Sequence, residues 1–70
     1  MTITINGKET ALAENPARTV ESLLEELDVA QRQYVTVELN GEILERDAFV
    51  KTPVQGGDAL EFIYFMGGGR

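Results

Sequence analysis

Residues 59–66 read ALEFIYFM, a stretch that is apolar nearly throughout. A short apolar run of this kind is typical of a strand at the centre of a sheet, or of a strand whose second face is kept for another molecule. Side chains alternate along a strand, so one face carries Leu60, Phe62, Tyr64 and Met66. If that face enters the core, Ile63 and Phe65 lie on the outside.

A β-hairpin is predicted at the other end of the chain. Residues 2–6 read TITIN, in which isoleucine and threonine alternate as in a half-buried strand. Asn6-Gly7 supplies the positive φ angles of a tight turn, and residues 8–12 can return as a second strand. The sequence ENP at residues 14–16 ends the hairpin, because the backbone ahead of a proline is restricted.

One helix is predicted to follow. Thr19 is suited to cap it with its hydroxyl group. Behind this residue, apolar side chains recur at the i, i+3, i+4 and i+7 spacing of a single helical stripe: Val20, Leu23, Leu24 and Leu27.

Two more strands and a long crossing are predicted between this helix and residue 59. Residues 34–39 (YVTVEL) alternate, and Asn40-Gly41 gives a second hairpin turn before a short strand at residues 42–44. Residues 45–57 are polar and irregular and predict a surface crossing. We expect Phe49 and Val50 to hold this crossing to the core.

The order strand, strand, helix, strand, short strand, strand predicts an α+β fold of the β-grasp, ubiquitin-like type. In this arrangement a mixed sheet of four to five strands packs on one helix. Seventy residues allow one domain, which we place at residues 1–66, followed by a flexible glycine-rich tail at residues 67–70.

The composition argues against several classes of function. The formal charge of −6 argues against nucleic acid and favours a basic protein partner. The absence of cysteine excludes disulfides and cysteine-ligated iron–sulfur clusters, and it fits a cytoplasmic location. No apolar run approaches the ~20 residues that cross a bilayer, so no membrane association is expected.

An enzyme is not expected either. Without histidine and cysteine, a base or nucleophile would have to come from carboxylates, lysines or hydroxyls, in a domain too small for an enclosed pocket. No loop with the spacing of a calcium site is present, so we expect neither a bound metal nor a bound cofactor.

The tail Gly67-Gly68-Gly69-Arg70 has two interpretations. It can be a frayed terminus, since terminal glycines are common. Alternatively, a tail without side chains can thread a narrow enzyme channel, where any Cβ atom would collide, and deliver a carboxylate to a nucleotide.

Taken together, these segments resemble the ThiS family of thiamine sulfur carriers, within the wider superfamily that includes MoaD. The likeness spans nearly the whole chain and rests on four stretches in order: NGK (6–8), TVESLL (19–24), VTVELNGEI (35–43) and GDALEFIYFMGGG (57–69).

The resemblance implies a cycle of sulfur transfer. A ubiquitin-activating-like enzyme would use ATP to adenylate a terminal glycine carboxylate, which then becomes a thiocarboxylate and gives its sulfur to a thiazole synthase. The family's terminal glycine pair matches Gly68 and Gly69, and Gly69 would carry the sulfur. The ATP would be bound by the activating enzyme.

Arg70 departs from the family pattern, because it holds the carboxyl group of Gly69 in a peptide bond. The resemblance offers one explanation: related carriers that serve cysteine or methionine synthesis have extra residues that a zinc metallopeptidase trims. Alternatively, Arg70 is a tolerated tail residue that a general peptidase removes. A carrier for molybdopterin synthesis, and a ubiquitin-like interaction module without sulfur chemistry, remain alternatives.

A partner-binding patch is predicted beside the tail. Ile63 and Phe65 would lie exposed there, with Tyr64 and Met66 as neighbours. The alternatives are that a loop from residues 45–55 covers them, or that they pack in a homodimer or crystal contact. Acidic side chains frame the patch or simply form a solvated face: Glu38, Glu42, Glu45, Asp47, Asp58 and Glu61.

Overall fold

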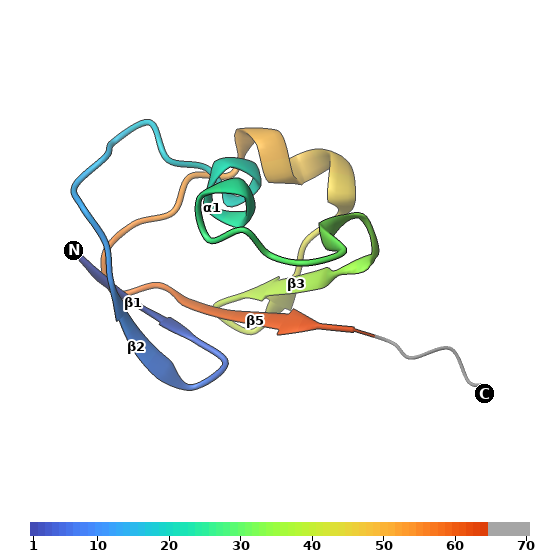
Figure 1. The fold of residues 1–70 in the computed structure, drawn as a ribbon, viewed down its shortest axis with the longest axis horizontal. Coiled ribbons are helices and arrows are strands. Elements are labelled where there is room, and N and C mark those ends of the chain that lie inside the picture. Colours follow the sequence, from blue (N-terminus) through green and yellow to red (C-terminus); the bar gives the residue numbers. More distant parts are fainter. Residues whose placement is uncertain (65–70) are drawn as a thin grey trace.

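The computed structural model of the chain describes residues 1–64. Its elements are β1 (Thr2–Ile5), β2 (Lys8–Ala11), α1 (Val20–Glu26), the 3-10 helix η1 (Arg32–Tyr34), β3 (Thr36–Leu39), β4 (Glu42–Ile43), the 3-10 helix η2 (Arg46–Lys51) and β5 (Ala59–Ile63). Figure 1 shows α1 and η2 on the same face of the sheet. The β-grasp prediction is confirmed.

The five strands lie in the order β2-β1-β5-β3-β4, which places β5 at the centre. β5 runs parallel to β1 and antiparallel to β3. The central strand predicted from its apolar sequence is therefore confirmed over Ala59–Ile63. Phe65 and Met66, which the prediction included, lie outside the described residues.

Both predicted Asn-Gly turns are present. The φ angles are 51° and 83° at Asn6 and Gly7, and 52° and 88° at Asn40 and Gly41. Positive φ at both central residues is the type I′ geometry, whose twist matches that of the flanking strands. These turns fix the register of the two antiparallel hairpins, in which Ile5 pairs with Lys8 and Leu39 with Glu42.

The helix begins at the predicted cap. The Thr19 hydroxyl oxygen accepts a hydrogen bond from the Ser22 N–H at 3.2 Å, and the Ser22 hydroxyl oxygen accepts one from the Thr19 N–H at 2.8 Å. This reciprocal pair satisfies two donors that a helix start otherwise leaves free. Val20, Leu23 and Leu24 are buried, and Leu27 packs half-buried at the C-cap.

Two predicted segments were wrong in detail. Residues 46–51 are not irregular but form η2, and only Phe49 enters the core: its exposed fraction is 2%, whereas that of Val50 is 66%. Consecutive residues of a helical segment point in different directions, so both could not face the core. Tyr34 belongs to η1 and is 69% exposed, and the third strand begins only at Thr36.

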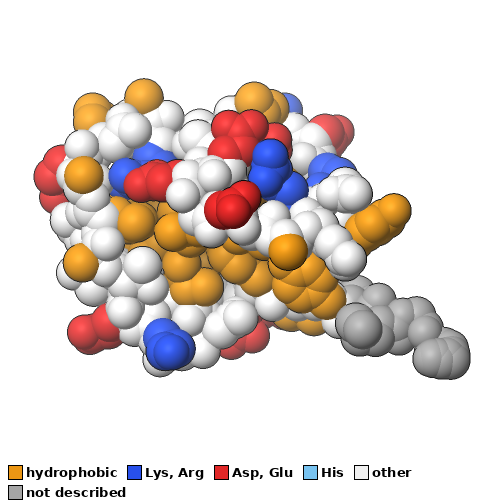
Figure 2. Space-filling model, viewed as in Figure 1, with side chains coloured by type: hydrophobic (Ala, Val, Ile, Leu, Met, Phe, Trp, Pro, Cys, Tyr) orange, Lys and Arg blue, Asp and Glu red, His pale blue; other side chains and the backbone are white. Residues whose placement is uncertain are grey.

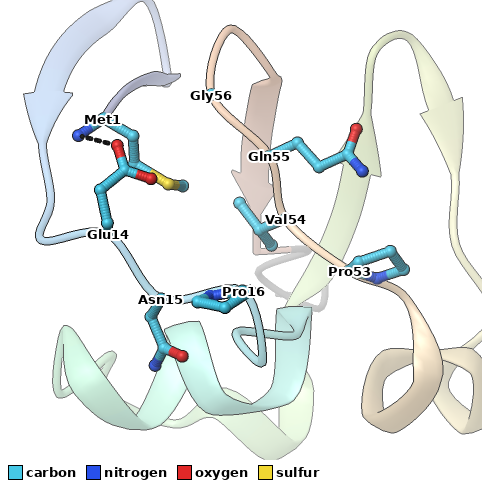
Figure 3. Close-up of a pocket in the computed structure, with 8 residues that line it drawn as sticks. All are labelled: Met1, Glu14, Asn15, Pro16, Pro53, Val54, Gln55 and Gly56. Atoms are coloured by element: carbon cyan, nitrogen blue, oxygen red, sulfur yellow. Dashed lines mark ion pairs between the residues drawn. The ribbon is translucent and has the colours of Figure 1, made fainter.

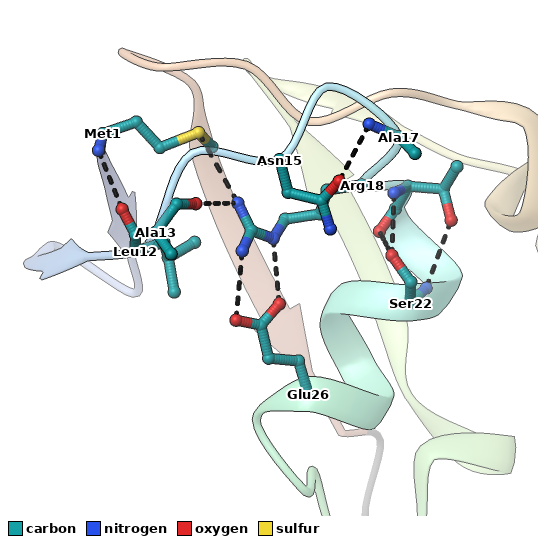
Figure 4. Close-up of polar contacts among 9 residues, drawn as sticks. Met1, Leu12, Ala13, Asn15, Ala17, Arg18, Ser22 and Glu26 are labelled. Carbon is teal, nitrogen blue, oxygen red and sulfur yellow. Dashed lines mark hydrogen bonds and ion pairs between the residues drawn. The ribbon is translucent and has the colours of Figure 1, made fainter.

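A buried arginine joins the segment between β2 and α1 to the helix (Figure 4). The Arg18 side chain is 3% exposed, and its Nε and Nη2 atoms donate to the two carboxylate oxygens of Glu26 at 2.9 and 3.1 Å. Its Nη1 atom donates to the Ala13 carbonyl oxygen at 2.8 Å. The bidentate pair therefore fixes the path of this segment across the end of the core.

Replacing Glu26 with alanine is expected to lower the free energy of unfolding by about 2 kcal/mol, because it leaves the Arg18 charge buried without its counterion. We take a value below that of a fully buried pair, since the Glu26 side chain is 41% exposed. Urea denaturation measures the change. Glu25→Ala is the matched control, because Glu25 is exposed and next in sequence. Equal losses from both variants would contradict a structural role for the ion pair.

Candidate functional site at the end of the central strand

In the sequence, three residues separate the end of β5 at Ile63 from the predicted reactive segment at residues 67–70. Figure 1 shows the C-terminal end of β5 at the side of the fold away from the N-terminus. The predicted thiocarboxylate residues Gly68 and Gly69, together with Gly67 and Arg70, lie outside the described residues, and so does the predicted domain boundary after residue 66. The structure therefore describes the chain up to Tyr64, which includes all of β5.

Two turn asparagines hold β5 from opposite sides. The Asn40 side-chain oxygen accepts a hydrogen bond from the Ala59 N–H at 2.9 Å, and the Asn6 side-chain oxygen accepts one from the Phe62 N–H at 2.9 Å. The β1–β5 ladder pairs only Thr4 with Ala59 and Ile5 with Leu60. The Asn6 side chain therefore accepts one further hydrogen bond from β5, beyond the last residue of β1.

Sequence reasoning assigned these asparagines to their turns and missed their contacts with β5. The signal was present in the residue type, because glycine also adopts positive φ but offers no side-chain acceptor. A hydrogen bond to a residue 19 or 56 positions away, however, cannot be predicted from the two residues of the turn.

Tyr64 connects the end of β5 to the loop after α1. Its hydroxyl group donates to the Ala30 carbonyl oxygen at 2.8 Å, and its side chain is 39% exposed. The predicted patch residue therefore has a fixed hydroxyl and a partly exposed ring. Together with the Asn6 contact, this bond orients the last described residues of the strand.

The predicted patch residue Ile63 lies on the face of the sheet away from α1. The β3–β5 register pairs Ile63 with Thr36 and places buried Leu60 and half-buried Phe62 on the opposite face. No segment from residues 45–55 crosses β5 on this outer face in Figure 1. Ile63 faces outward as predicted, but it is half-buried and not exposed, whereas Ile43 of the edge strand β4 is 66% exposed.

The six acidic residues predicted to frame the patch have different environments. Glu38 and Glu61 face each other directly across β3 and β5. Asp58 instead belongs to the structural framework, because its carboxylate accepts hydrogen bonds from the Asn40 amide at 3.1 Å and the Gln55 N–H at 2.8 Å. Glu45 and Asp47 lie at the start of η2, which covers the other face.

Two open hollows lie elsewhere on the molecule. One, of about 390 Å³, lies between the segments 14–16 and 53–56, where the Met1 amino group pairs with Glu14 at 3.2 Å (Figure 3). The second, of about 320 Å³, lies beside Arg32 and Arg46. Neither combines a nucleophile with a base, and residues 1–64 contain no cluster of carboxylates suited to a metal ion. No helix among these residues is long and apolar enough to cross a membrane.

Figure 2 shows hydrophobic side chains gathered between the β1–β2 hairpin and α1. Several apolar residues at the margin of the core are only partly buried, among them Ile5, Leu12 and Leu27. They pack against the buried cluster, so their primary role is to close the core.

Four findings from comparisons with known proteins bear on the identity of the chain. The family model described as the ThiS family matches residues 2–69. A crystal structure of a thiamine biosynthesis protein (ThiS) from Geobacter metallireducens is 56% identical, with a TM-score of 0.90 over 99% of this chain and 100% of that chain. A solution structure of a thiamine biosynthesis protein from the same organism is also 56% identical, with a TM-score of 0.78 over 100% of this chain and 90% of that one.

The remaining finding concerns a longer protein. A thiazole synthase from Paramagnetospirillum magneticum is 42% identical over 69 residues, which is 99% of this chain. The chain spans 20% of the length of that relative.

Proposed function

Because the chain belongs to the ThiS family, we propose that it is a sulfur carrier whose Gly69 carboxylate is adenylated and converted to a thiocarboxylate. The observation that carries the proposal is the extent of the family match, which runs from residue 2 through the glycine run and ends at Gly69. The sulfur would serve thiazole formation in thiamine biosynthesis. The similar Geobacter metallireducens protein, itself a thiamine biosynthesis protein, supports this destination.

The chemistry requires a partner that supplies activation. A carboxylate oxygen of Gly69 attacks the α-phosphate of ATP, which forms an acyl adenylate and releases pyrophosphate. Hydrosulfide then attacks the acyl carbon, a carbon–sulfur bond forms, and AMP leaves with the electron pair of the broken carbon–oxygen bond. The product is a thiocarboxylate, and the carrier's own task is to present this carbon.

The described part of the fold supports presentation rather than reaction. The Asn6 contact and the Tyr64–Ala30 hydrogen bond hold the last described residues of the chain, Phe62 to Tyr64, in place. Fixing one end of an extended substrate reduces the conformational freedom that is lost when it binds. The hollows near Met1 and Arg46 take no part in this proposal.

Arg70 must be removed before activation, because it occupies the carboxyl group of Gly69. We propose cleavage by a metallopeptidase, as the alternative carriers for cysteine or methionine synthesis would also require. The partners proposed are therefore this peptidase, a ubiquitin-activating-like adenylating enzyme and a thiazole synthase. The similarity to one segment of a longer thiazole synthase supports the last of these.

Intact mass spectrometry tests the proposal. Two chains, one ending at Gly69 and one ending at Arg70, are incubated with ATP, sulfide and the adenylating enzyme. We expect only the first to become heavier by about 16 Da, the difference between sulfur and oxygen. A chain ending at Gly69 that stays unmodified at saturating enzyme would favour an interaction module without sulfur chemistry. Transfer of the sulfur to a purified thiazole synthase would distinguish thiamine from the other acceptors.

A further inference from the structure

Two arginines, Arg32 and Arg46, line the open hollow of about 320 Å³ that is formed by residues of α1, η1 and η2. No ion pair among residues 1–64 includes either of them, although the chain is rich in carboxylates. Arg32 is half-buried, and a charge that is partly withdrawn from water without a counterion costs free energy. Within the described residues, the hollow thus holds two positive charges without a paired carboxylate.

Arg46 is held in place before any ligand binds. Its Nη1 atom donates to the Arg32 carbonyl oxygen at 3.0 Å, and its Nη2 atom donates to the Val35 carbonyl oxygen at 2.6 Å. Its guanidinium carbon also lies 5.1 Å from the centroid of the Phe49 ring. A guanidinium group has five N–H donors, so donors remain for a ligand. A side chain that is already positioned loses less conformational freedom on binding.

The acidic residues near the hollow do not cancel its positive charge. Glu21 lines the hollow but forms an ion pair with neither arginine. Glu45 and Asp47 flank Arg46 in the sequence, yet neither of them lines the hollow. Two positive side chains and one negative side chain therefore line it, and this excess of positive charge favours an anionic ligand.

The hollow lies at the end of the fold where β5 finishes. The Tyr64 hydroxyl group donates to the Ala30 carbonyl oxygen at 2.8 Å, and Ala30 precedes Arg32 by two residues. Figure 1 shows this segment, the green stretch after α1, close to the C-terminal end of β5. A partner that binds the chain beyond β5 can therefore also reach the hollow.

We propose that this hollow docks the adenylating enzyme, through an aspartate or glutamate side chain of the enzyme that binds between Arg32 and Arg46. Two guanidinium groups can donate charge-assisted hydrogen bonds to both oxygens of one carboxylate. The hollow takes no part in presenting the tail. The inference thus goes beyond the proposed function and rests on it only for the identity of the partner.

Chemistry favours the activating step as the one that needs this contact. Every protein chain ends in a carboxylate, so an enzyme that adenylates one must select its substrate by contacts elsewhere on the carrier. A thiazole synthase receives a thiocarboxylate, a group that already differs from an ordinary chain terminus. A second copy of this chain is disfavoured as the partner, because two chains of formal charge −6 repel each other.

Arg32→Gln tests the assignment, because it removes one charge from the hollow and keeps the backbone carbonyl that holds Arg46. We expect the Kd of the full chain for the adenylating enzyme to increase about fivefold to tenfold at low salt, and less at high salt. The Tm should stay within about 2 °C. The sign is informative, because loss of a positive charge would otherwise strengthen the attraction of an acidic chain to a basic enzyme.

Lys51→Gln is the matched control, because it changes the net charge by the same amount. Lys51 is exposed at the end of η2 and does not line the hollow, so its Kd should be unchanged or slightly lower. Arg32→Lys should have an intermediate Kd, since an ammonium group keeps the charge but lacks the planar pair of donors. ATP–pyrophosphate exchange with chains ending at Gly69 adds a KM, which should increase for Arg32→Gln while kcat stays within about twofold.

Glu21→Gln tests the same hollow with the opposite change in charge. This variant removes a carboxylate that competes for the two arginines, so we expect its Kd to decrease about twofold to threefold. Long-range attraction between the acidic chain and a basic enzyme would change the Kd in the other direction. An increase in Kd would therefore contradict the assignment.

An unchanged or lower Kd for Arg32→Gln overturns the inference, and so does an equal increase for Lys51→Gln. If Arg32→Gln weakened binding to a purified thiazole synthase alone, the hollow would belong to the sulfur acceptor, which also overturns it. Failure of the proposed function looks different: the wild-type chain ending at Gly69 would then support no exchange, while the direct titration would still test the hollow.

Discussion

Removing Gly68 and Gly69 is expected to abolish adenylation, with a loss of at least about 100-fold in the rate of ATP–pyrophosphate exchange, because the carboxylate no longer reaches the nucleotide. The truncated chain ends at Gly67, and it is compared with the chain that ends at Gly69. Stability should change little, with a Tm within about 2 °C of that of the chain ending at Gly69. The reason is that every buried hydrophobic residue described lies between Ile3 and Leu60.

The two readouts separate a reactive tail from a structural one. Thermal unfolding of both chains gives the stability, and the exchange assay gives the activity. Gly68→Ala in the chain ending at Gly69 is the finer test, because it keeps the length and adds only a Cβ atom. A large loss of Tm on truncation would place the glycines in the folded domain, and undiminished exchange would move the activated carboxylate elsewhere.

Replacing Phe49 with alanine is expected to lower the free energy of unfolding by about 3–5 kcal/mol, the usual effect of removing a buried aromatic side chain. A domain of this size has a total stability of roughly 4–10 kcal/mol, so the variant should be close to unfolding. Phe49 has the largest of the fully buried side chains. Its ring also lies 5.1 Å from the guanidinium carbon of Arg46, a cation–π contact within η2 itself.

Val50→Ala is the control, because Val50 is next in sequence but points to solvent. Its effect should stay within about 0.5 kcal/mol. Urea denaturation with a common m-value compares the two variants directly. Similar losses for both would mean that residues 45–57 cover the core with both side chains, as the sequence alone led us to expect. They would then contradict the orientation of η2.

The local elements were predictable because each has a strong local cause. The Asn-Gly pairs require positive φ, the stripe from Val20 to Leu27 repeats at helical spacing, and residues 59–63 are too apolar for an edge strand. The failures lie where local signals are weak. Residues 46–51 carry no helical stripe, and Tyr34 continues the alternation of β3 although the strand starts two residues later.

Some features of the candidate site were likewise predictable from the sequence, and others were not. The glycine run, the alternation that separates Ile63 from Leu60, and the overall acidity are properties of consecutive residues, and the sequence sufficed to single them out. It could not show which of the six acidic residues that were predicted to frame the patch lie beside one another. That depends on the register between β3 and β5, which brings residues 38 and 61 opposite each other and leaves Asp58 in the turn framework.

The sequence by itself thus determined the order of the elements, the central position of the last strand and the family to which the chain belongs. Only the tertiary structure decided that Phe49 rather than Val50 enters the core, that Arg18 is buried against Glu26, and that Asn6 and Asn40 hold β5. The physical reason is the distance along the sequence over which each kind of interaction acts. Turn and helix preferences act over a few neighbouring residues, whereas these contacts arise between segments that become neighbours only when the sheet closes around the core.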